Sequence, residues 1–173
     1  MSATKPLEGI RVLDLTVALA GPYGSLLLGG LGAEVIRVES PSGGDIARNN
    51  PPYVNQEGIH FGVRHADDVS LSILNRARNK KSITLDLKSP QGKALFMQLA
   101  QECDVLIENA SEGATARLGV DYESVRAANP KIIYASIKAF GEPSPYPNLK
   151  GMDIIVQALS GIMDVTGFAD GPP

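Results

Sequence analysis

The sequence predicts an α/β fold, Rossmann-like, with a mostly parallel sheet covered by helices. Short runs rich in β-branched residues alternate along the chain with stretches of helical periodicity. The spacing between the runs leaves room for the crossover connections that parallel strands require. With 173 residues, of which 43% are hydrophobic and 20% charged, the chain is long enough for one domain, or most of one.

Five runs are expected to form strands, over residues 10–15, 34–39, 82–87, 104–109 and 131–137. Four other stretches predict helices, over residues 23–31, 89–103, 122–128 and 153–163. The second helix has the clearest signals, because Ser89 can cap its N-terminus and Pro90 suits the first helical position. Leu95 and Leu99 then share one face of it.

Two stretches depart from this alternation. Residues 40–72, which contain "PSGGD" and "NNPPYVNQEG", are too long for a structureless loop in a compact domain. We therefore expect them to carry function or structure of their own. Residues 141–148, "GEPSPYPN", contain three prolines, which favour a stiff, extended path.

Composition excludes several classes of function. The formal net charge of −3 gives no support to a nucleic-acid partner. The N-terminus lacks the apolar region of a secretion signal, and the longest apolar stretch, residues 12–36, is interrupted by Asp14, Pro22 and Glu34. We therefore expect no membrane segment and a cytoplasmic location.

The few cysteine and histidine residues do not predict a metal site. Cys103 is the single cysteine, so it can form neither an internal disulfide nor a cysteine-based zinc site, and a small buried hydrophobe is its expected role. His60 and His65 are five residues apart, which is not the spacing of a helical metal pair. Both are expected to be ordinary surface or loop residues.

The turn after the first strand is the first candidate binding site. A glycine-rich turn can present main-chain N–H groups to an anion, and Glu39 ends the second strand where an acid of a dinucleotide site would meet a ribose. The G-x-G-x-x-G spacing is absent, however, and Pro22 removes one donor. Gly21 can equally serve close packing of helix on sheet, so both interpretations stay open.

A cluster of cations is the second candidate. Arg76, Arg78, Lys80 and Lys81 stand together before a predicted strand, with Lys88 just past its end. Such a cluster suits a phosphorylated ligand, but a solvated loop explains it as well.

The closing stretch is the third candidate. Lys150 and Asp153 flank a flexible joint, and Asp153 is placed to cap the following helix. Gln157, one turn further on, would share its face.

Four blocks of sequence together carry a resemblance to a known family. They begin at "PLEGIRVLDL", "NRARNKKSIT", "ARLGVDYESV" and "GMDIIVQALS", and cover residues 6–45, 75–109, 116–141 and 151–173. In this order they resemble the family III CoA-transferases of the CaiB/BaiF type, the group that includes formyl-CoA transferase, carnitine CoA-transferase and α-methylacyl-CoA racemase. Residues 1–173 are similar to only the N-terminal part of such a protein, a part of the Rossmann-like CoA-binding domain.

The resemblance implies a reaction. In these transferases a carboxylate of the enzyme attacks an acyl-CoA thioester, a mixed anhydride forms, and CoA passes through further exchange to an acceptor carboxylic acid. Coenzyme A or acyl-CoA is therefore expected as a substrate, no permanently bound cofactor is expected, and an interlocked homodimer is implied. The nucleophilic aspartate of the family falls beyond Pro173, so residues 1–173 are expected to be inactive alone.

Particular residues inherit roles from this resemblance. Lys88, Arg117 and Lys150 are expected to meet phosphates. Asp153 and Leu19 are expected to shape the pocket near the reacting thioester. The full set of expected CoA-binding residues is Ala18, Leu85, Lys88, Asn109, Ala110, Arg117, Leu118 and Lys150.

Three positions depart from the family pattern. Ser40 replaces an arginine of formyl-CoA transferase, and Leu19 replaces a glutamine, so the acyl specificity of that enzyme is not carried over. Met152 stands where the racemases have a histidine base, which disfavours racemisation.

Two other functions stay open. One is a CoA- or nucleotide-binding module without catalysis, which CoA binding without acyl transfer would reveal. The other is an NAD-binding oxidoreductase domain that uses Glu39 and the Gly21 turn, which a preference for NAD over CoA would reveal.

Overall fold

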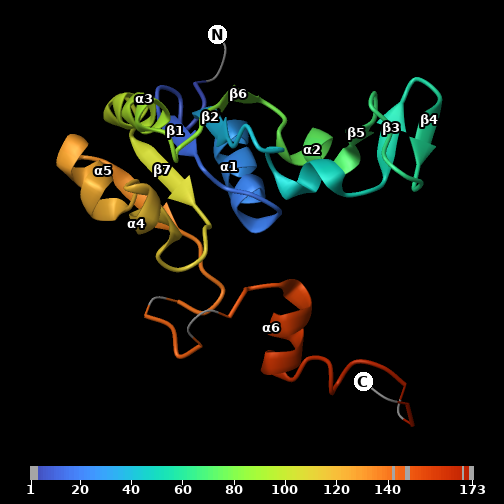
Figure 1. The fold of residues 1–173 in the computed structure, drawn as a ribbon. Helices are drawn as coiled ribbons and strands as arrows, with labels where there is room; N and C mark the ends of the chain where they lie inside the picture. The colour runs from blue at the N-terminus through green and yellow to red at the C-terminus, as the bar shows by residue number, and fades with distance from the viewer. Residues whose placement is uncertain (1–3, 142, 147–148, 169, 172–173) are drawn as a thin grey trace.

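A parallel five-stranded sheet forms the centre of the computed structural model, which describes residues 4–141, 143–146, 149–168 and 170–171 (Figure 1). Within these residues the strand order is β6-β2-β1-β7-β8, and every pairing is parallel. The strands are β1 (Arg11–Asp14), β2 (Glu34–Glu39), β6 (Lys80–Thr84), β7 (Val105–Glu108) and β8 (Ile133–Ser136). The Rossmann-like α/β prediction is confirmed.

Helices cover both faces of this sheet. The described helices are α1 (Ala20–Gly30), α2 (Leu71–Arg76), α3 (Pro90–Gln101), α4 (Ala114–Leu118), α5 (Tyr122–Ala128) and α6 (Asp153–Ser160). Helix α1 packs on one face of the sheet, and α3 and α5 pack on the other. Alternate strand residues point to opposite faces, so Leu13 joins a core with Phe96 of α3 and Val125 of α5. Val12 faces the other way and packs with Val35 in a second core, on the side of α1.

Most predicted element bounds are correct within two or three residues, and the differences have local causes. Helix α1 starts at Ala20 rather than at residue 23, because Pro22 lies in the first turn, where its missing N–H costs nothing. Strand β6 starts at Lys80 rather than at residue 82, since Lys80 pairs with Val35 of β2. Helix α6 ends at Ser160 rather than at residue 163, because Gly161 takes a left-handed conformation there.

The long connection after β2 has structure of its own, as expected. It contains a 3-10 turn, η1 (Ile46–Asn49), and the strands β3 (Tyr53–Asn55), β4 (Gly58–His60) and β5 (Val69–Ser70). Within the described residues these strands form a small antiparallel sheet in the order β4-β3-β5, which lies beyond α2 at one end of the molecule (Figure 1).

The prediction of a stiff, extended path over residues 141–148 is wrong for the part that the structure describes. Residues 142, 147 and 148 lie outside that part. The backbone bends at residues 143, 145 and 146, and the rings of Phe140 and Tyr146 lie 5.4 Å apart.

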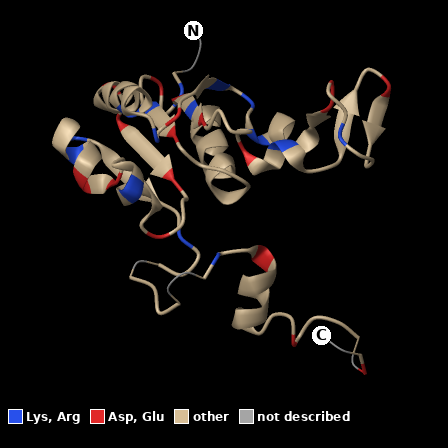
Figure 2. Ribbon diagram, in the orientation of Figure 1, with Lys and Arg blue, Asp and Glu red and all other residues tan. Residues whose placement is uncertain are grey.

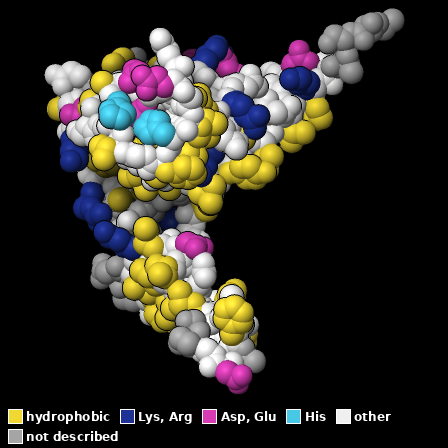
Figure 3. Space-filling view, turned by 90° about the vertical axis from the view of Figure 1, so that its right-hand side faces the viewer, with side chains coloured by type: hydrophobic (Ala, Val, Ile, Leu, Met, Phe, Trp, Pro, Cys, Tyr) yellow, Lys and Arg dark blue, Asp and Glu magenta, His cyan; other side chains and the backbone are white. Residues whose placement is uncertain are grey.

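The last segment stands apart from the sheet. Figure 1 shows α6 on an arm below the main body, and no residue of α6 is buried. Its large side chains are nevertheless apolar, and Figure 3 shows hydrophobic atoms gathered on this arm. Among the described residues, no helix has both the length and the apolar character to cross a membrane. Charges of both signs are interspersed along the main body (Figure 2).

Candidate functional site

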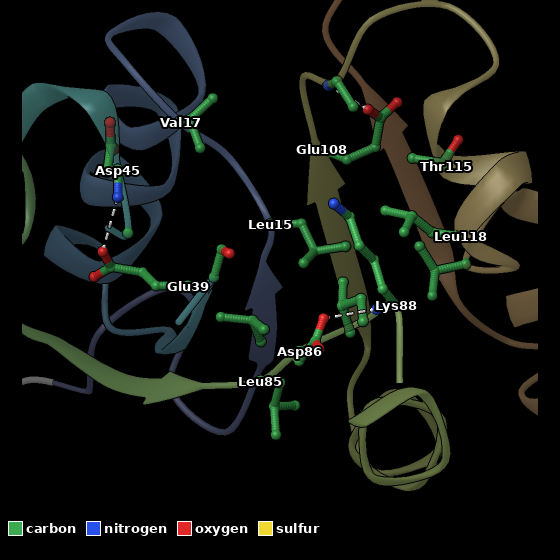
Figure 4. A pocket seen from close by; sticks show the side chains of 16 residues that line it. Leu15, Val17, Glu39, Asp45, Leu85, Asp86, Lys88, Glu108, Thr115 and Leu118 are labelled. Atoms are coloured by element: carbon green, nitrogen blue, oxygen red, sulfur yellow. Dashed lines mark hydrogen bonds between the residues drawn. The ribbon is translucent and has the colours of Figure 1, made fainter. Parts of the chain in front are cut away.

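A cavity of about 280 Å³ opens at the carboxyl ends of the central strands (Figure 4). The chain runs from β1 to β2 and β6 on one side of β1, and then returns through α3 to β7 on the other side. Strands β1 and β7 therefore flank the point where the direction of winding reverses. Open α/β sheets bind their ligands in the crevice at this topological switch point.

The cavity combines an apolar floor with a few charged groups. Leu15 of the β1 turn, Val38 of β2 and Val120 contribute apolar surface, as does the segment after β6 through Leu85 and Leu87. Charged groups at its walls are Glu39, Asp45, Asp86, Lys88 and Glu108. Lys88 is the one cation among the described lining residues, so it is the group that would meet an anionic part of a ligand, while the apolar floor suits a flat apolar part.

Four residues that sequence analysis assigned to CoA binding line this one cavity. Leu85 and Lys88 follow β6, Ala110 follows β7, and Leu118 ends α4. In Figure 4 Lys88 and Leu118 extend into the space between the strand ends. Segments that are far apart in the sequence therefore meet at the switch point.

Two more of the predicted residues stand beside the cavity. Asn109 precedes Ala110, and its side chain hydrogen-bonds both main-chain groups of Val17, which lines the cavity. Ala18 follows Val17 in the turn between β1 and α1.

The three cations expected to bind phosphates differ in their position relative to the cavity. Lys88 and Arg117 are both exposed, and in the described part of the chain their side-chain nitrogens have no hydrogen-bond or ion-pair partner. Lys150 lies on the arm that leads to α6, and neither it, Asp153 nor Leu19 is among the residues that line the cavity. The structure therefore brings two of the three expected phosphate-binding cations to the same end of the sheet.

Comparison with known proteins decides the family. A family model described as CoA-transferase family III matches residues 7–173. The chain belongs to CoA-transferase family III. It is 45% identical to the succinate–glutarate CoA-transferase of Agrobacterium fabrum over 97% of this chain and 41% of that protein. It is 42% identical to the formyl-CoA:oxalate CoA-transferase of Streptomyces avermitilis over 98% of this chain and 38% of that protein.

Solved structures agree with this assignment. A CAIB/BAIF family protein from Brucella suis matches with a TM-score of 0.86 and 40% identity, over 99% of this chain and 43% of that one. The chain thus spans about two fifths of the length of the relatives that it matches.

The departures from the transferase pattern can now be located. Ser40 lines the cavity, and its hydroxyl accepts a hydrogen bond from the Ser42 amide at 3.2 Å. Leu19 is 58% exposed just before α1, and Met152 is 56% exposed just before α6.

The expected role of Asp153 as a helix cap is wrong. Asp153 is the first residue inside α6, and the capping position belongs to Met152, which makes no capping bond through its side chain. The Asp153 carboxylate instead accepts a hydrogen bond from Gln157 Nε2 at 2.6 Å, so the predicted shared face is confirmed. An acid in the first turn still interacts favourably with the helix dipole.

Three of the four cations in the basic cluster bind other parts of the chain, whereas Arg78 is exposed and bonds to the nearby Asn75. Lys80 is the clearest case, because its ammonium is buried and donates to Asp14 at 3.0 Å and to Ser25 at 2.7 Å. Burial lowers its pKa, while the Asp14 carboxylate opposes that change. Arg76 donates to the main-chain oxygen of Ala18, and Lys81 pairs with Glu34. Each of these cations therefore ties one element to another.

The structure favours packing over dinucleotide binding at the turn after β1. A Cβ atom at Gly21 would lie 2.3 Å from the Cβ of Thr16, so only glycine fits there. Glu39 is buried, and Arg48 holds both of its carboxylate oxygens, at 2.6 and 2.8 Å. The Arg48 hydrogen bond lowers the pKa of Glu39 to about 2, and the Asp45 N–H also binds it. A ribose hydroxyl could therefore bind the Glu39 carboxylate only if the ion pair with Arg48 were broken, which argues against an NAD-binding site.

Sequence analysis missed two buried acids that line the cavity, Asp45 and Glu108. Glu108 is 1% exposed and ends β7, where it accepts hydrogen bonds from the Ala110 amide at 2.7 Å and from Ser136. Lys138 pairs with it at 2.9 Å and also donates to the Ala110 oxygen at 2.7 Å. The available signal was a charged residue at the carboxyl end of an otherwise apolar strand.

The two histidines lie next to each other, and the cysteine is buried. His60 Nε2 lies 3.0 Å from the buried carboxylate of Asp68, so this histidine is paired rather than an ordinary surface residue. Its ring and that of His65 lie side by side on the surface (Figure 3). Among the described residues, no group of three or more His, Cys, Asp or Glu could hold a metal ion. Cys103 is buried, which raises its pKa to about 11 and confirms the expected hydrophobic role.

Proposed function

We propose that the intact protein is an acyl-CoA:carboxylate CoA-transferase, and that residues 1–173 supply much of its CoA site. The observation that carries this proposal is the meeting of Leu85, Lys88, Ala110 and Leu118 at one switch-point cavity. These residues come from three separate segments, and each was assigned to CoA from the sequence alone. Membership of CoA-transferase family III supports the same reaction.

The lining suits the two chemical parts of coenzyme A. The apolar floor formed by Leu15, Leu85 and Leu118 fits the flat adenine ring, which gains free energy by leaving water. Lys88 and Arg117 lie at the same end of the sheet with unpaired cationic groups, so they suit the phosphates.

The proposed transfer needs a carboxylate nucleophile on the enzyme. That carboxylate attacks the thioester carbonyl, the C–S bond breaks, and CoA leaves as a thiolate while an anhydride forms. CoA then returns to the enzyme carbonyl and releases the first acid, and the acceptor carboxylate repeats the two steps in reverse to leave as its own CoA ester. The resemblance locates the nucleophile after Pro173, so we expect residues 1–173 tested alone to bind CoA without transferring it.

We further propose a small dicarboxylic acid as the acceptor. The names of the relatives pair CoA with glutarate or oxalate, both dicarboxylates. We also propose that the intact protein is a homodimer and is located in the cytoplasm. The exposed apolar surface of α6 supports association with another protein segment.

The test is isothermal titration of residues 1–173 with CoA and, separately, with NAD. Saturable CoA binding that is tighter than NAD binding is expected. The reverse preference would replace the transferase proposal with an oxidoreductase domain. CoA binding by the full-length protein without exchange between succinyl-CoA and glutarate would favour a binding module instead.

A further inference from the structure

The turn between β1 and α1 holds an unfavourable backbone conformation beside the cavity. Ala18 has a φ of +66°, in the left-handed region that favours glycine. For an alanine this conformation costs about 1–2 kcal/mol, so it persists only where surrounding contacts fix it. Its neighbour Val17 lines the cavity, so the shape of the cavity depends on this turn.

Three side chains from distant elements bind the four main-chain polar groups of Val17 and Ala18, within the part of the chain that the structure describes. Asn109, after β7, accepts from the Val17 amide at 2.9 Å and donates to the Val17 oxygen at 2.8 Å. Asp45, before η1, accepts from the Ala18 amide at 2.9 Å. Arg76, the last residue of α2, donates to the Ala18 oxygen at 2.8 Å. We call Asp45, Arg76 and Asn109 the turn clamp.

The turn clamp is itself fixed. Asp45 is 1% exposed, and its carboxylate also accepts hydrogen bonds from the Ala47 amide at 2.8 Å and from the buried Arg37. In the sequence, Arg76 is 58 residues away from Ala18, and Asn109 is 92 residues away from Val17. These bonds thus connect the turn to segments that are far from it in the sequence.

We propose that the residues of the turn clamp are positioning residues for CoA binding, which hold the Val17–Ala18 turn in the conformation that the ligand meets. This inference rests on the proposed function. It gives Asn109 an indirect role, since both ends of its amide are occupied by Val17. It also gives a role to Arg76, which touches the turn rather than a phosphate.

The Arg76→Met variant tests the proposal, with Arg78→Met as its matched control. Both changes remove one guanidinium in the same short segment, but within the described residues Arg78 binds only Asn75. In residues 1–173, Arg76→Met is expected to weaken CoA binding about tenfold, the effect of one lost charge-assisted hydrogen bond. It is also expected to speed hydrogen exchange at the Val17 and Ala18 amides, followed by NMR, while Arg78→Met changes neither quantity.

A rescue experiment separates positioning from general stability. Glycine adopts a positive φ without cost, so adding Ala18→Gly to Arg76→Met is expected to recover part of the lost affinity. Urea unfolding of each variant shows whether stability changed in parallel. The proposal would be overturned if Arg76→Met and Arg78→Met had the same CoA affinity and the same rate of amide hydrogen exchange. It would also be overturned if the loss of CoA affinity paralleled the loss of unfolding stability and Ala18→Gly restored none of it.

Failure of the proposed function is distinguishable from failure of this inference. If residues 1–173 with the natural sequence do not bind CoA, the proposed CoA site is wrong, and the turn clamp then has no role in CoA binding. The exchange measurements need no ligand, so they still decide whether Arg76 orders the turn. If CoA binds and Arg76→Met changes neither the CoA affinity nor the amide hydrogen exchange, the proposed function stands and only the positioning role of the turn clamp is rejected.

Discussion

Lys88 and Glu39 show two ways in which a charged residue serves this cavity. Glu39 is buried and paired with arginines, so it fixes the wall and has little capacity for a ligand. Lys88 is exposed at the cavity and has no side-chain partner among the described residues, so its charge is available. Lys88 is therefore a candidate binding residue because it combines an unpaired charge with a place at the cavity.

Replacement of Lys88 by alanine is expected to weaken CoA binding to residues 1–173 about tenfold, because one phosphate contact is lost. Lys131→Ala is the matched control, since Lys131 is exposed near the amino end of β8, at the opposite edge of the sheet from the cavity. Titration calorimetry measures both variants. Equal affinities for the two variants would contradict a phosphate-binding role for Lys88.

The low pKa of Glu39 predicts a contribution to stability that depends on pH. Its pKa is about 2 in the folded chain, against an ordinary value of 4.5, chiefly because of the Arg48 hydrogen bond. As the pH falls from about 5 to about 2, the unfolded chain takes up a proton at this group before the folded chain does. The stability from Glu39 is therefore present above this window and lost within it.

Glu39→Gln is expected to flatten the loss of stability over that window, measured by urea unfolding at several pH values. Glu57→Gln is the control, because Glu57 is exposed and, within the described residues, its carboxylate has no partner. Parallel pH profiles for the natural sequence and Glu39→Gln would show that this carboxylate is not held in its charged form.

At the scale of single residues, the resemblance selected residues that lie together at the cavity, whereas local sequence patterns did not reveal the buried ion pairs. Leu85, Lys88, Ala110 and Leu118 were assigned by resemblance, and the structure brings them to one cavity. The role of Lys80 was not predictable, because no local pattern reveals that Asp14 and Ser25 will fold over it. A run of basic residues therefore contains no information on which of its charges will be buried.

Among the elements, those with strong local signals were predicted well. Helix α3 begins as expected, with Ser89 accepting a hydrogen bond from the Gly92 amide at 3.0 Å and Pro90 in the first turn. The small sheet of β3, β4 and β5 was not predicted as strands. Strand β5 has only two residues, so its pairing with Tyr53 and Val54 depends on tertiary contacts rather than on periodicity.

The cap of α3 gives a prediction at this scale. Ser89→Ala is expected to destabilise the folded chain by about 1 kcal/mol, because the Gly92 amide loses its partner. Ser111→Ala is a fair comparison, since Ser111 is exposed and, in the described residues, its hydroxyl makes no hydrogen bond. Urea unfolding measures both changes, and equal midpoints would show that the cap contributes nothing.

At the scale of the whole molecule, residues 1–173 carry a CoA-transferase fold over about two fifths of the length of their relatives. The sheet and both cores are formed within this span. The α6 arm differs, because Ile154, Leu159 and Phe168 are more than half exposed. Apolar side chains at such density suit contact with further protein.

A comparison of residues 1–173 with the full-length protein tests whether CoA binding and CoA transfer depend on different parts of the chain. Residues 1–173 are expected to bind CoA but to leave succinyl-CoA and glutarate unchanged, because the proposed nucleophile lies elsewhere in the protein. The full-length protein is expected to exchange CoA between them, which chromatography of the CoA esters detects. Exchange by residues 1–173 alone would place the nucleophile within this span.

The pairing of the buried acids has a consequence for how a polyanion reaches the cavity. Glu39, Asp45 and Glu108 are each neutralised in place by Arg37, Arg48 or Lys138, so they add little repulsion toward an approaching phosphate. Among the described lining residues, the exposed Asp86 is the one acid without an ion pair. The attractive field then comes from exposed cations such as Lys88 and Arg117, which counterions screen over about 10 Å at 0.1 M salt. Association with CoA should accordingly slow as ionic strength rises, while the internal pairs, shielded from those ions, keep the shape of the site unchanged.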